Sequence, residues 1–205
     1  MIKSFFSRLS LGRIFLILWI PTILAILSFQ AATHLLSMPT PIDPYKIKTA
    51  VYANLSFDQP RWLAVHVVAA DCSCSGSLVD QLLSYPMDGE VDEVVLFAGP
   101  HPNIDKLRNY GYDVIQMTPQ NMELEYGIVA APLFVVFSPD KELKYLGGYY
   151  ANNRDWTSLD RGILTKLQAK QNVEERRVFG CPVAEGLKEQ LDPTGIKRLI
   201  SRIKN

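Results

Sequence analysis

The chain has only three cysteines in 205 residues and no excess of charge of either sign. Lysine plus arginine and aspartate plus glutamate each number 21, so the formal net charge is zero. This balance gives no electrostatic reason to expect a nucleic-acid-binding protein. An odd number of cysteines allows one disulfide and a spare thiol, or a triad that acts together. Internal repeats are absent, and a hydrophobic content of 48% excludes a disordered chain.

The amino-terminal region combines a basic flank with an uncharged apolar run. Basic residues and no acidic ones precede residues 14–29, which are sixteen residues without a charge. About 20 apolar residues at ~1.5 Å each cross a hydrocarbon core of ~30 Å, and Pro21 would kink such a helix without excluding it. We therefore expect residues 1–36 to be a cytoplasmic stub and a transmembrane signal anchor. The charge bias puts the N-terminus in the cytoplasm and the main domain in the periplasm of a bacterial inner membrane.

A cleaved signal peptide and a buried helix of a soluble protein are the alternatives to an anchor. Residues 29–32, Phe-Gln-Ala-Ala, match the small-residue cleavage pattern poorly, so a retained anchor in contact with inner-membrane lipid is favoured. Whether the segment is a cleaved signal peptide or a retained anchor, we expect the rest of the chain to be exported to a compartment where disulfides persist.

The rest of the chain is predicted to be a spacer followed by an α/β domain. Residues 37–44 hold three prolines and predict a stiff spacer, followed by a domain at 45–173 and a helical extension at 174–205. Apolar runs, turns and caps predict a mixed sheet with helices on both faces. The expected strands are 52–57, 62–69, 92–98, 113–117 and a hairpin from 133 to 149, and the expected helices are 75–85, 103–110, 118–126 and 156–171.

Cys72 and Cys74 occupy the turn between the strand at 62–69 and the helix at 75–85. A helix start offers free backbone N–H groups and a positive dipole end, both of which stabilise a thiolate. The pair therefore indicates redox or metal chemistry. A disulfide across one residue would be strained and would suit an oxidant or isomerase. Buried, inert thiols are the alternative, but the polar and small neighbours argue against it: Asp71, Ser73, Ser75 and Gly76.

The strand that ends at the cysteine turn, the helix after it and the segment ELEYGIVAAPLFVVFSPDKELKYLGGY at 123–149 together resemble the thioredoxin-fold superfamily. The resemblance covers residues 50–171. With the predicted anchor, the chain is also similar to membrane-anchored TlpA-type and RedB-type periplasmic thiol-disulfide proteins. The implied fold is a thioredoxin-like mixed sheet flanked by helices.

The resemblance also implies roles for individual residues. Cys72 stands where the nucleophilic cysteine belongs, and Cys74 resembles the resolving cysteine although it comes one position early. Pro132, after Ala131, matches the cis-proline that faces the cysteines and binds an extended substrate backbone. His66 falls where many relatives have a buried acid that moves protons for the resolving thiol. A histidine bonded within the core is its alternative role.

Cys181 lies beyond the resemblance, in the sequence Phe-Gly-Cys-Pro at 179–182. A proline in the first turn of a helix would leave Cys181 near an N-cap, which favours a thiolate. Three roles stay open for it: a resolving thiol for Cys72 or Cys74, a third metal ligand, or an unused cysteine.

Further aromatic and basic residues give weaker signals. Tyr149, Tyr150 and Trp156 could line a substrate groove, with core packing as the default. His101 is expected in a loop, His34 is expected to be inert, and the basic helix predicted at 193–204 is expected to be solvated.

These observations predict a membrane-anchored thiol-disulfide oxidoreductase that acts on protein thiols and disulfides through Cys72, Cys74, Pro132, Cys181 and His66, without a cofactor. The first alternative is a copper-binding protein that holds Cu(I) through Cys72, Cys74 and Cys181. Sco-like copper chaperones share this fold, but they space their cysteines more widely. The second alternative is a non-catalytic assembly module.

Overall fold

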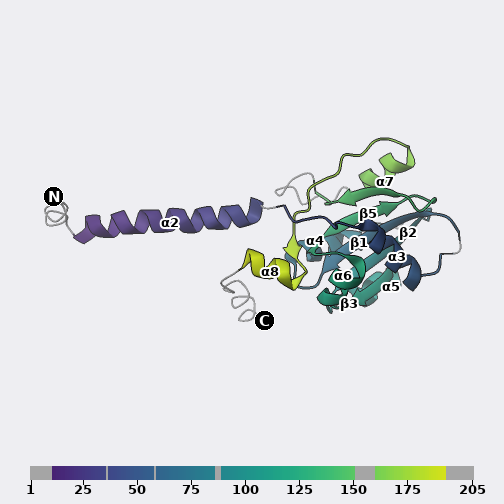
Figure 1. Ribbon diagram of the computed structural model, residues 1–205, viewed down its shortest axis with the longest axis horizontal. Helices are drawn as coiled ribbons and strands as arrows, with labels where there is room; N and C mark the ends of the chain where they lie inside the picture. Colours follow the sequence, from purple (N-terminus) through teal and green to yellow (C-terminus); the bar gives the residue numbers. More distant parts are fainter. Residues whose placement is uncertain (1–10, 36, 58, 86–88, 151–159, 193–205) are drawn as a thin grey trace. The chain divides into compact units, whose positions relative to one another are not determined.

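The computed structural model describes residues 11–35, 37–57, 59–85, 89–150 and 160–192 (Figure 1). The chain divides into two compact units, Met1–Leu36 and Ser37–Asn205. Three predicted features lie outside the described residues: the basic stub at 1–10, the start of the 156–171 helix with Trp156, and the basic helix at 193–204.

The first unit contains helix α2, Leu11–Leu35, with Pro21 inside it. Among the residues that the structure describes, no helix is long and apolar enough to cross a membrane. Within the helix, the apolar run at 14–29 is followed by the polar residues Gln30, Thr33 and His34.

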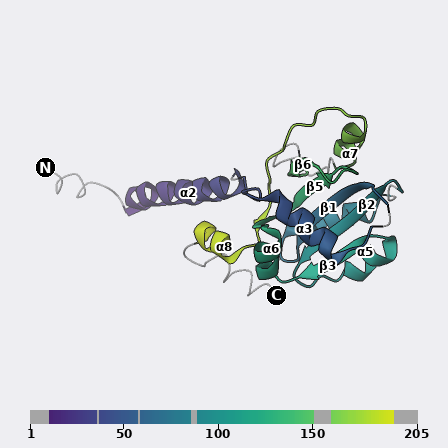
Figure 2. The same ribbon diagram turned by 45° about the vertical axis from the view of Figure 1, so that its right-hand side comes forward.

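The second unit is built on a five-stranded sheet in the order β3-β2-β1-β5-β6 (Figures 1 and 2). Strands β1, β2 and β3 are parallel, whereas β5 and β6 run antiparallel to their neighbours. This arrangement confirms the predicted mixed sheet. The bounds are β1 Trp62–Ala69, β2 Val91–Ala98, β3 Asp113–Met117, β5 Leu133–Phe137 and β6 Leu143–Gly147.

Each face of the sheet carries its own hydrophobic cluster. Because side chains alternate along a strand, Val65 and Val67 of β1 pack with residues of α3 and α6, while Ala64 and Val68 pack with residues of α4, α5 and α7. The helices that cover the first face are α3 Pro44–Asn54 and α6 Pro119–Tyr126; those on the second are α4 Ser73–Leu82, α5 Ile104–Tyr110 and α7 Asp160–Gln168.

Local capping explains both a correct and a wrong prediction. The Thr118 side chain accepts a hydrogen bond from the Asn121 N–H (3.1 Å), and Gly127 ends α6 in the left-handed conformation (φ 70°). The strand predicted at 52–57 is wrong, because α3 continues through Asn54. Asp43 caps that helix by accepting from the Tyr45 N–H, and Ile47 and Val51, four residues apart, are fully buried against the sheet.

The segments on either side of the predicted domain both lie within the second unit. Residues 37–44 contact the C-terminal part, since the Met38 N–H donates to the Val178 carbonyl oxygen (2.8 Å). Residues 171–177 have no regular structure, and they lead to a two-residue strand, β7 Cys181–Pro182, and to α8 Glu185–Leu191.

A buried charge cluster joins the sheet to α7. Glu93 of β2, 2% exposed, accepts two hydrogen bonds from the Arg161 guanidinium (2.6 and 3.2 Å). Its other neighbour is His66, whose Nε2 lies 3.3 Å from Glu93 Oε2 and whose Nδ1 lies 2.8 Å from the Tyr149 hydroxyl. Burial alone would raise the pKa of the Glu93 carboxyl, but His66 and Arg161 hold this pKa below its ordinary value.

We predict that Arg161→Met lowers the free energy of unfolding by about 3 kcal/mol at pH 7, because it leaves a buried carboxylate without its cation. The difference from wild type should shrink on acidification. A depressed folded-state pKa contributes stability above the ordinary carboxyl pKa of about 4.3, and this contribution disappears as the pH falls through the folded-state value.

Denaturant unfolding at pH 7 and at pH 3–4 measures both effects. Lys144→Met is the matched control, because its exposed partner Glu142 stays solvated (Nζ to Oε2 2.6 Å in wild type) and the cost should stay below about 1 kcal/mol. Equal costs for the two variants would contradict the role given to the buried cluster.

Candidate functional site

Cys72 stands at the junction between β1 and α4. It is the N-cap residue of α4, with an extended backbone (φ −111°, ψ 117°), and its carbonyl oxygen accepts from the Gly76 N–H (3.1 Å). The residue is 3% exposed. Its side chain makes no cap hydrogen bond to the N–H groups of α4. The position at the positive end of the helix dipole is nevertheless one that favours a thiolate when the cysteine is reduced.

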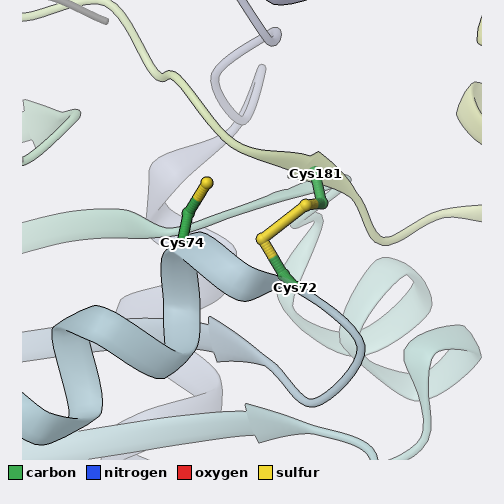
Figure 3. A group of neighbouring side chains, drawn as sticks. All are labelled: Cys72, Cys74 and Cys181. Carbon is green, nitrogen blue, oxygen red and sulfur yellow. A yellow bond between two sulfur atoms is a disulfide. The ribbon is translucent and has the colours of Figure 1, made fainter. Parts of the chain in front are cut away.

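Cys72 forms a disulfide with Cys181, across a separation of 109 residues (Figure 3). The Cα atoms of the two residues are 5.9 Å apart, within the range that a disulfide spans. The Cys72–Cys74 pairing considered from the sequence is therefore not the disulfide of this structure. Cys181 has instead the position of partner to Cys72, one of the roles left open for it.

Cys74 lies in the first turn of α4 with a free thiol (Figure 3). Cys72 belongs to the extended chain before the helix and Cys74 to the helix itself. Their side chains leave the backbone in different directions, and Cys74 rises beside the disulfide without joining it (Figure 3). Burial raises the pKa of the Cys74 thiol, and a hydrogen bond with Ser73 opposes the shift without cancelling it.

The three sulfur atoms of Cys72, Cys74 and Cys181 all lie within 4.8 Å of one another. A small movement would therefore allow thiol–disulfide exchange between any two of these sulfur atoms. The grouping was predicted from the sequence only as one of several possibilities for Cys181.

Cys181 reaches this position through β7, which pairs antiparallel with β4, Ala130–Ala131. Ala131 is the direct partner of Cys181, and Ala130 is the partner of Pro182. The predicted N-cap position of Cys181 is wrong, because Pro182 belongs to the strand and α8 begins only at Glu185, after the N-cap residue Ala184.

Pro132 follows a cis peptide bond, as the resemblance implied. The carbonyl oxygen of the preceding residue, Ala131, lies 3.9 Å from Cys72 Sγ. The cis-proline turn and the N-cap cysteine therefore face each other, and β7 lies against both.

None of the contacts described for His66 is with a cysteine. Its ring lies in the cluster beneath α4, α5 and α7, where it contacts Phe134, Tyr112 and Tyr149, whereas Cys72 belongs to the cluster on the other face of the sheet. Its partners are those of a bonded core histidine, and nothing in this arrangement supports proton transfer to Cys74.

The remaining candidates take ordinary structural positions. Tyr149 and Tyr150 are 0% and 1% exposed and belong to the core, so neither lines a groove. His101 accepts a hydrogen bond at Nδ1 from the Asn103 N–H (3.2 Å) in a loop, and burial lowers its pKa although Asp80 opposes this. The side chain of His34 lies outside the described part of the chain.

Gly180 was not predicted as part of the site, and Ala131 was predicted only as the residue before Pro132. A Cβ atom on Gly180 would lie closer to the Ala131 carbonyl oxygen than any real contact, so the two backbones touch here. The only sequence signal was the Gly-Cys-Pro order at 180–182, which has no periodicity to reveal a strand.

A surface pocket of about 440 Å³ lies away from this site, beside Trp62 at the start of β1. Cys72 follows the opposite end of that strand. The pocket is lined by Pro60, Arg61, Trp62, Gly89, Glu90, Pro139 and Gln168, none of which is a cysteine or histidine.

Neither a protein-family model nor a curated protein sequence matches the chain. Among solved structures, a hypothetical protein from Sinorhizobium meliloti 1021 is 17% identical over 61% of this chain and 80% of its own, with a TM-score of 0.50. An uncharacterized conserved protein from Geobacillus kaustophilus is 14% identical over 60% of this chain and 77% of its own, with a TM-score of 0.47. A secreted Mycobacterium tuberculosis disulfide oxidoreductase homologous to E. coli DsbE is 10% identical over 65% of this chain and 98% of its own, with a TM-score of 0.38. The likeness to the Sinorhizobium protein concerns the fold alone.

We predict that the oxidised protein has one thiol that reacts with a maleimide, Cys74, and that Cys74→Ser removes it. The rate should rise with pH to values above about 8.5, the ordinary cysteine pKa, because burial disfavours the Cys74 thiolate. Mass mapping of the labelled protein should find a peptide pair joined through Cys72 and Cys181. A Cys72–Cys74 link with the label on Cys181 would contradict the structure.

Proposed function

Since the chain has the thioredoxin fold, we propose that it exchanges thiols and disulfides with other proteins through the couple formed by Cys72 and Cys181. The observation that carries this proposal is a disulfide at the N-cap of α4, directly beside the cis peptide bond of Pro132. A purely structural disulfide would not need to join these two features of the fold.

In the reducing direction, the Cys72 thiolate attacks one sulfur of a substrate disulfide. The substrate S–S bond breaks, a mixed disulfide forms, and the second substrate sulfur leaves as a thiolate that takes up a proton. The Cys181 thiolate then attacks Cys72 Sγ, which forms the Cys72–Cys181 bond and releases the first substrate thiol. Two electrons pass from the protein dithiol to the substrate, and the reverse sequence oxidises a substrate dithiol.

The helix start supports Cys72 in both directions. The dipole of α4 favours the negative charge that Cys72 carries when it attacks a disulfide and when it departs as a leaving group. Cys74 lacks this position at the N-cap, and its raised pKa makes it the weaker thiolate at neutral pH. We therefore assign Cys72 as the exchanging residue, Cys181 as the resolving residue and Cys74 as a neighbour that the cycle does not require.

A location outside the cytosol fits this chemistry. A disulfide of this kind persists in an oxidising compartment and is rare where glutathione and thioredoxin keep thiols reduced. We therefore retain the periplasm of a bacterium as the proposed location.

We predict that the oxidised full chain introduces disulfides into a reduced, unfolded model protein. Cys72→Ser and Cys181→Ser should each reduce the rate to the uncatalysed level, because neither variant can form the couple. Cys74→Ser should retain most of the wild-type rate. Loss of substrate thiols, followed by a colorimetric thiol assay, is the measurement, and loss of activity in Cys74→Ser alone would contradict the assigned roles.

The second candidate function is binding of Cu(I), and the observation that favours it is the grouping of the three sulfurs within 4.8 Å. At metal–sulfur distances of about 2.3 Å, three thiolates around one ion in a trigonal plane lie about 4.0 Å apart, so the group would have to contract by less than about 1 Å. Soft thiolates suit Cu(I). The site requires reduction first, since two of its three sulfurs now form a disulfide.

Cys74→Ser separates the two functions. If the chain is a copper-binding protein, the reduced wild type should take up one Cu(I) per chain and the variant should bind at least about tenfold more weakly, because a trigonal site has lost one of its three ligands. If the chain only exchanges thiols, the two proteins should bind Cu(I) equally weakly. Competition with a Cu(I) chelator of known affinity measures the difference.

A further inference from the structure

Residues 176–184 lie along the cis-proline turn in the way that a bound peptide strand would. Cys181 and Pro182 pair antiparallel with Ala131 and Ala130. The N–H groups of Val183 and Ala184 both donate to the Val129 carbonyl oxygen (2.7 and 3.1 Å). The resulting two-stranded sheet is separate from the central sheet and contains no other strand among the described residues.

The approach is close because glycines line it on both sides. A Cβ atom on Gly180 would lie 2.0 Å from the Ala131 carbonyl oxygen and 2.6 Å from Pro132 Cδ. On the neighbouring edge, the Gly148 N–H donates to the Arg176 carbonyl oxygen (2.9 Å), and a Cβ on Gly148 would lie 2.1 Å from the Arg177 carbonyl oxygen. No side chain fits at these points, so the position before Cys181 accepts only glycine.

Apart from the disulfide, residues 176–184 are held by three buried side chains and by backbone hydrogen bonds, including one from the Met38 N–H to the Val178 carbonyl oxygen. Val178, Val183 and Ala184 are buried, whereas residues 171–177 before them have no regular structure, and α8 after them has no buried residue. The disulfide from Cys181 to Cys72 is the covalent link between this segment and the N-cap of α4.

We infer that residues 176–184 are a tethered occupant of a polypeptide-binding edge at Ala130–Ala131, and that a cysteine-bearing strand of a substrate protein, with glycine directly before its cysteine, takes their place. The inference rests on the proposed function and adds to it the class of partner. When Cys72 joins a substrate cysteine, that cysteine lies where Cys181 lies now, and its own backbone pairs with Ala131.

The same inference explains how product leaves. The Cys181 thiolate attacks Cys72 Sγ, the bond from Cys72 to the substrate sulfur breaks, and the substrate departs as a thiolate. As the Cys72–Cys181 bond forms, β7 pairs again with β4 and occupies the edge from which the substrate strand departs. Resolution and displacement of product are therefore carried out by one segment.

Peptides with the sequence of residues 176–184, RRVFGCPVA, test the edge directly. The cysteine of each peptide is activated as a disulfide with an aromatic thiol, and the protein is the full chain with Cys74→Ser and Cys181→Ser, so that Cys72 is its only thiol. Attack by the Cys72 thiolate forms the protein–peptide disulfide and releases the aromatic thiolate, which is followed by its absorbance.

The expected result is that this peptide couples at least about tenfold faster than a peptide with alanine in place of its glycine, because the added Cβ has no room against the Ala131 carbonyl oxygen. A small aromatic disulfide without a peptide controls for the reactivity of Cys72. Equal rates for the two peptides would overturn the inference.

Gly180→Ala, added to the same Ser-substituted chain, tests whether residues 176–184 compete for the edge. The tethered segment should then leave the edge, and the glycine peptide should couple faster than it does to the parent chain. An unchanged or lower rate, with the small disulfide reacting normally, would overturn the competition between segment and peptide. Circular dichroism checks that the variant folds, and the comparison of the two peptides stands without it.

The proposed function is tested separately, by the oxidation of a reduced model protein. If the wild-type disulfide fails to oxidise any protein dithiol, the proposed function fails, whichever peptide couples faster. If the wild type is active and the peptides couple equally, only the polypeptide-binding edge fails.

Discussion

The bond between Cys72 and Cys181 is the constraint on which the arrangement of the site depends. It joins the N-cap residue of α4 to a two-residue strand 109 positions later, and so attaches the C-terminal segment to the cis-proline turn. Closing a loop of that length removes freedom from the unfolded chain, a stabilisation of about 2–4 kcal/mol for a typical disulfide. The same bond is the proposed reactive group, so reduction changes both the chemistry of Cys72 and the hold on residues 176–184.

The rest of the fold places and shields this bond. The eight residues of β1, all apolar except His66, end shortly before the cysteine turn. Strand β4 leads through the cis peptide bond into β5, the neighbour of β1 in the sheet. Helix α4 then directs its positive end at Cys72. The buried cluster of His66, Glu93 and Arg161 lies on the other face of the sheet from Cys72, and we assign it to the stability of the scaffold.

Local signals in the sequence were sufficient for most of the scaffold. The apolar run at 62–69 coincides with β1, and Thr118 and Gly127 mark the ends of α6. The partner of Cys72 could not be derived in this way, because contacts between residues 109 positions apart leave no local pattern. The resemblance drew attention to Cys74, whereas Cys181 reaches the site through a strand too short to show alternation. Apolar residues at 52–57 suggested a strand, but the cap at Asp43 and the buried pair Ile47 and Val51 decide for a helix.

A redox titration of the full chain tests the central claim most directly. The protein is equilibrated at a series of ratios of reduced to oxidised glutathione, quenched with acid, alkylated and mapped by mass spectrometry. The account predicts that Cys72 and Cys181 change together between disulfide and two thiols at one definable potential, while Cys74 is alkylated at every ratio. A Cys72–Cys181 bond that stays oxidised in excess dithiothreitol without denaturant, or a reversible bond formed by Cys74 instead, would contradict it.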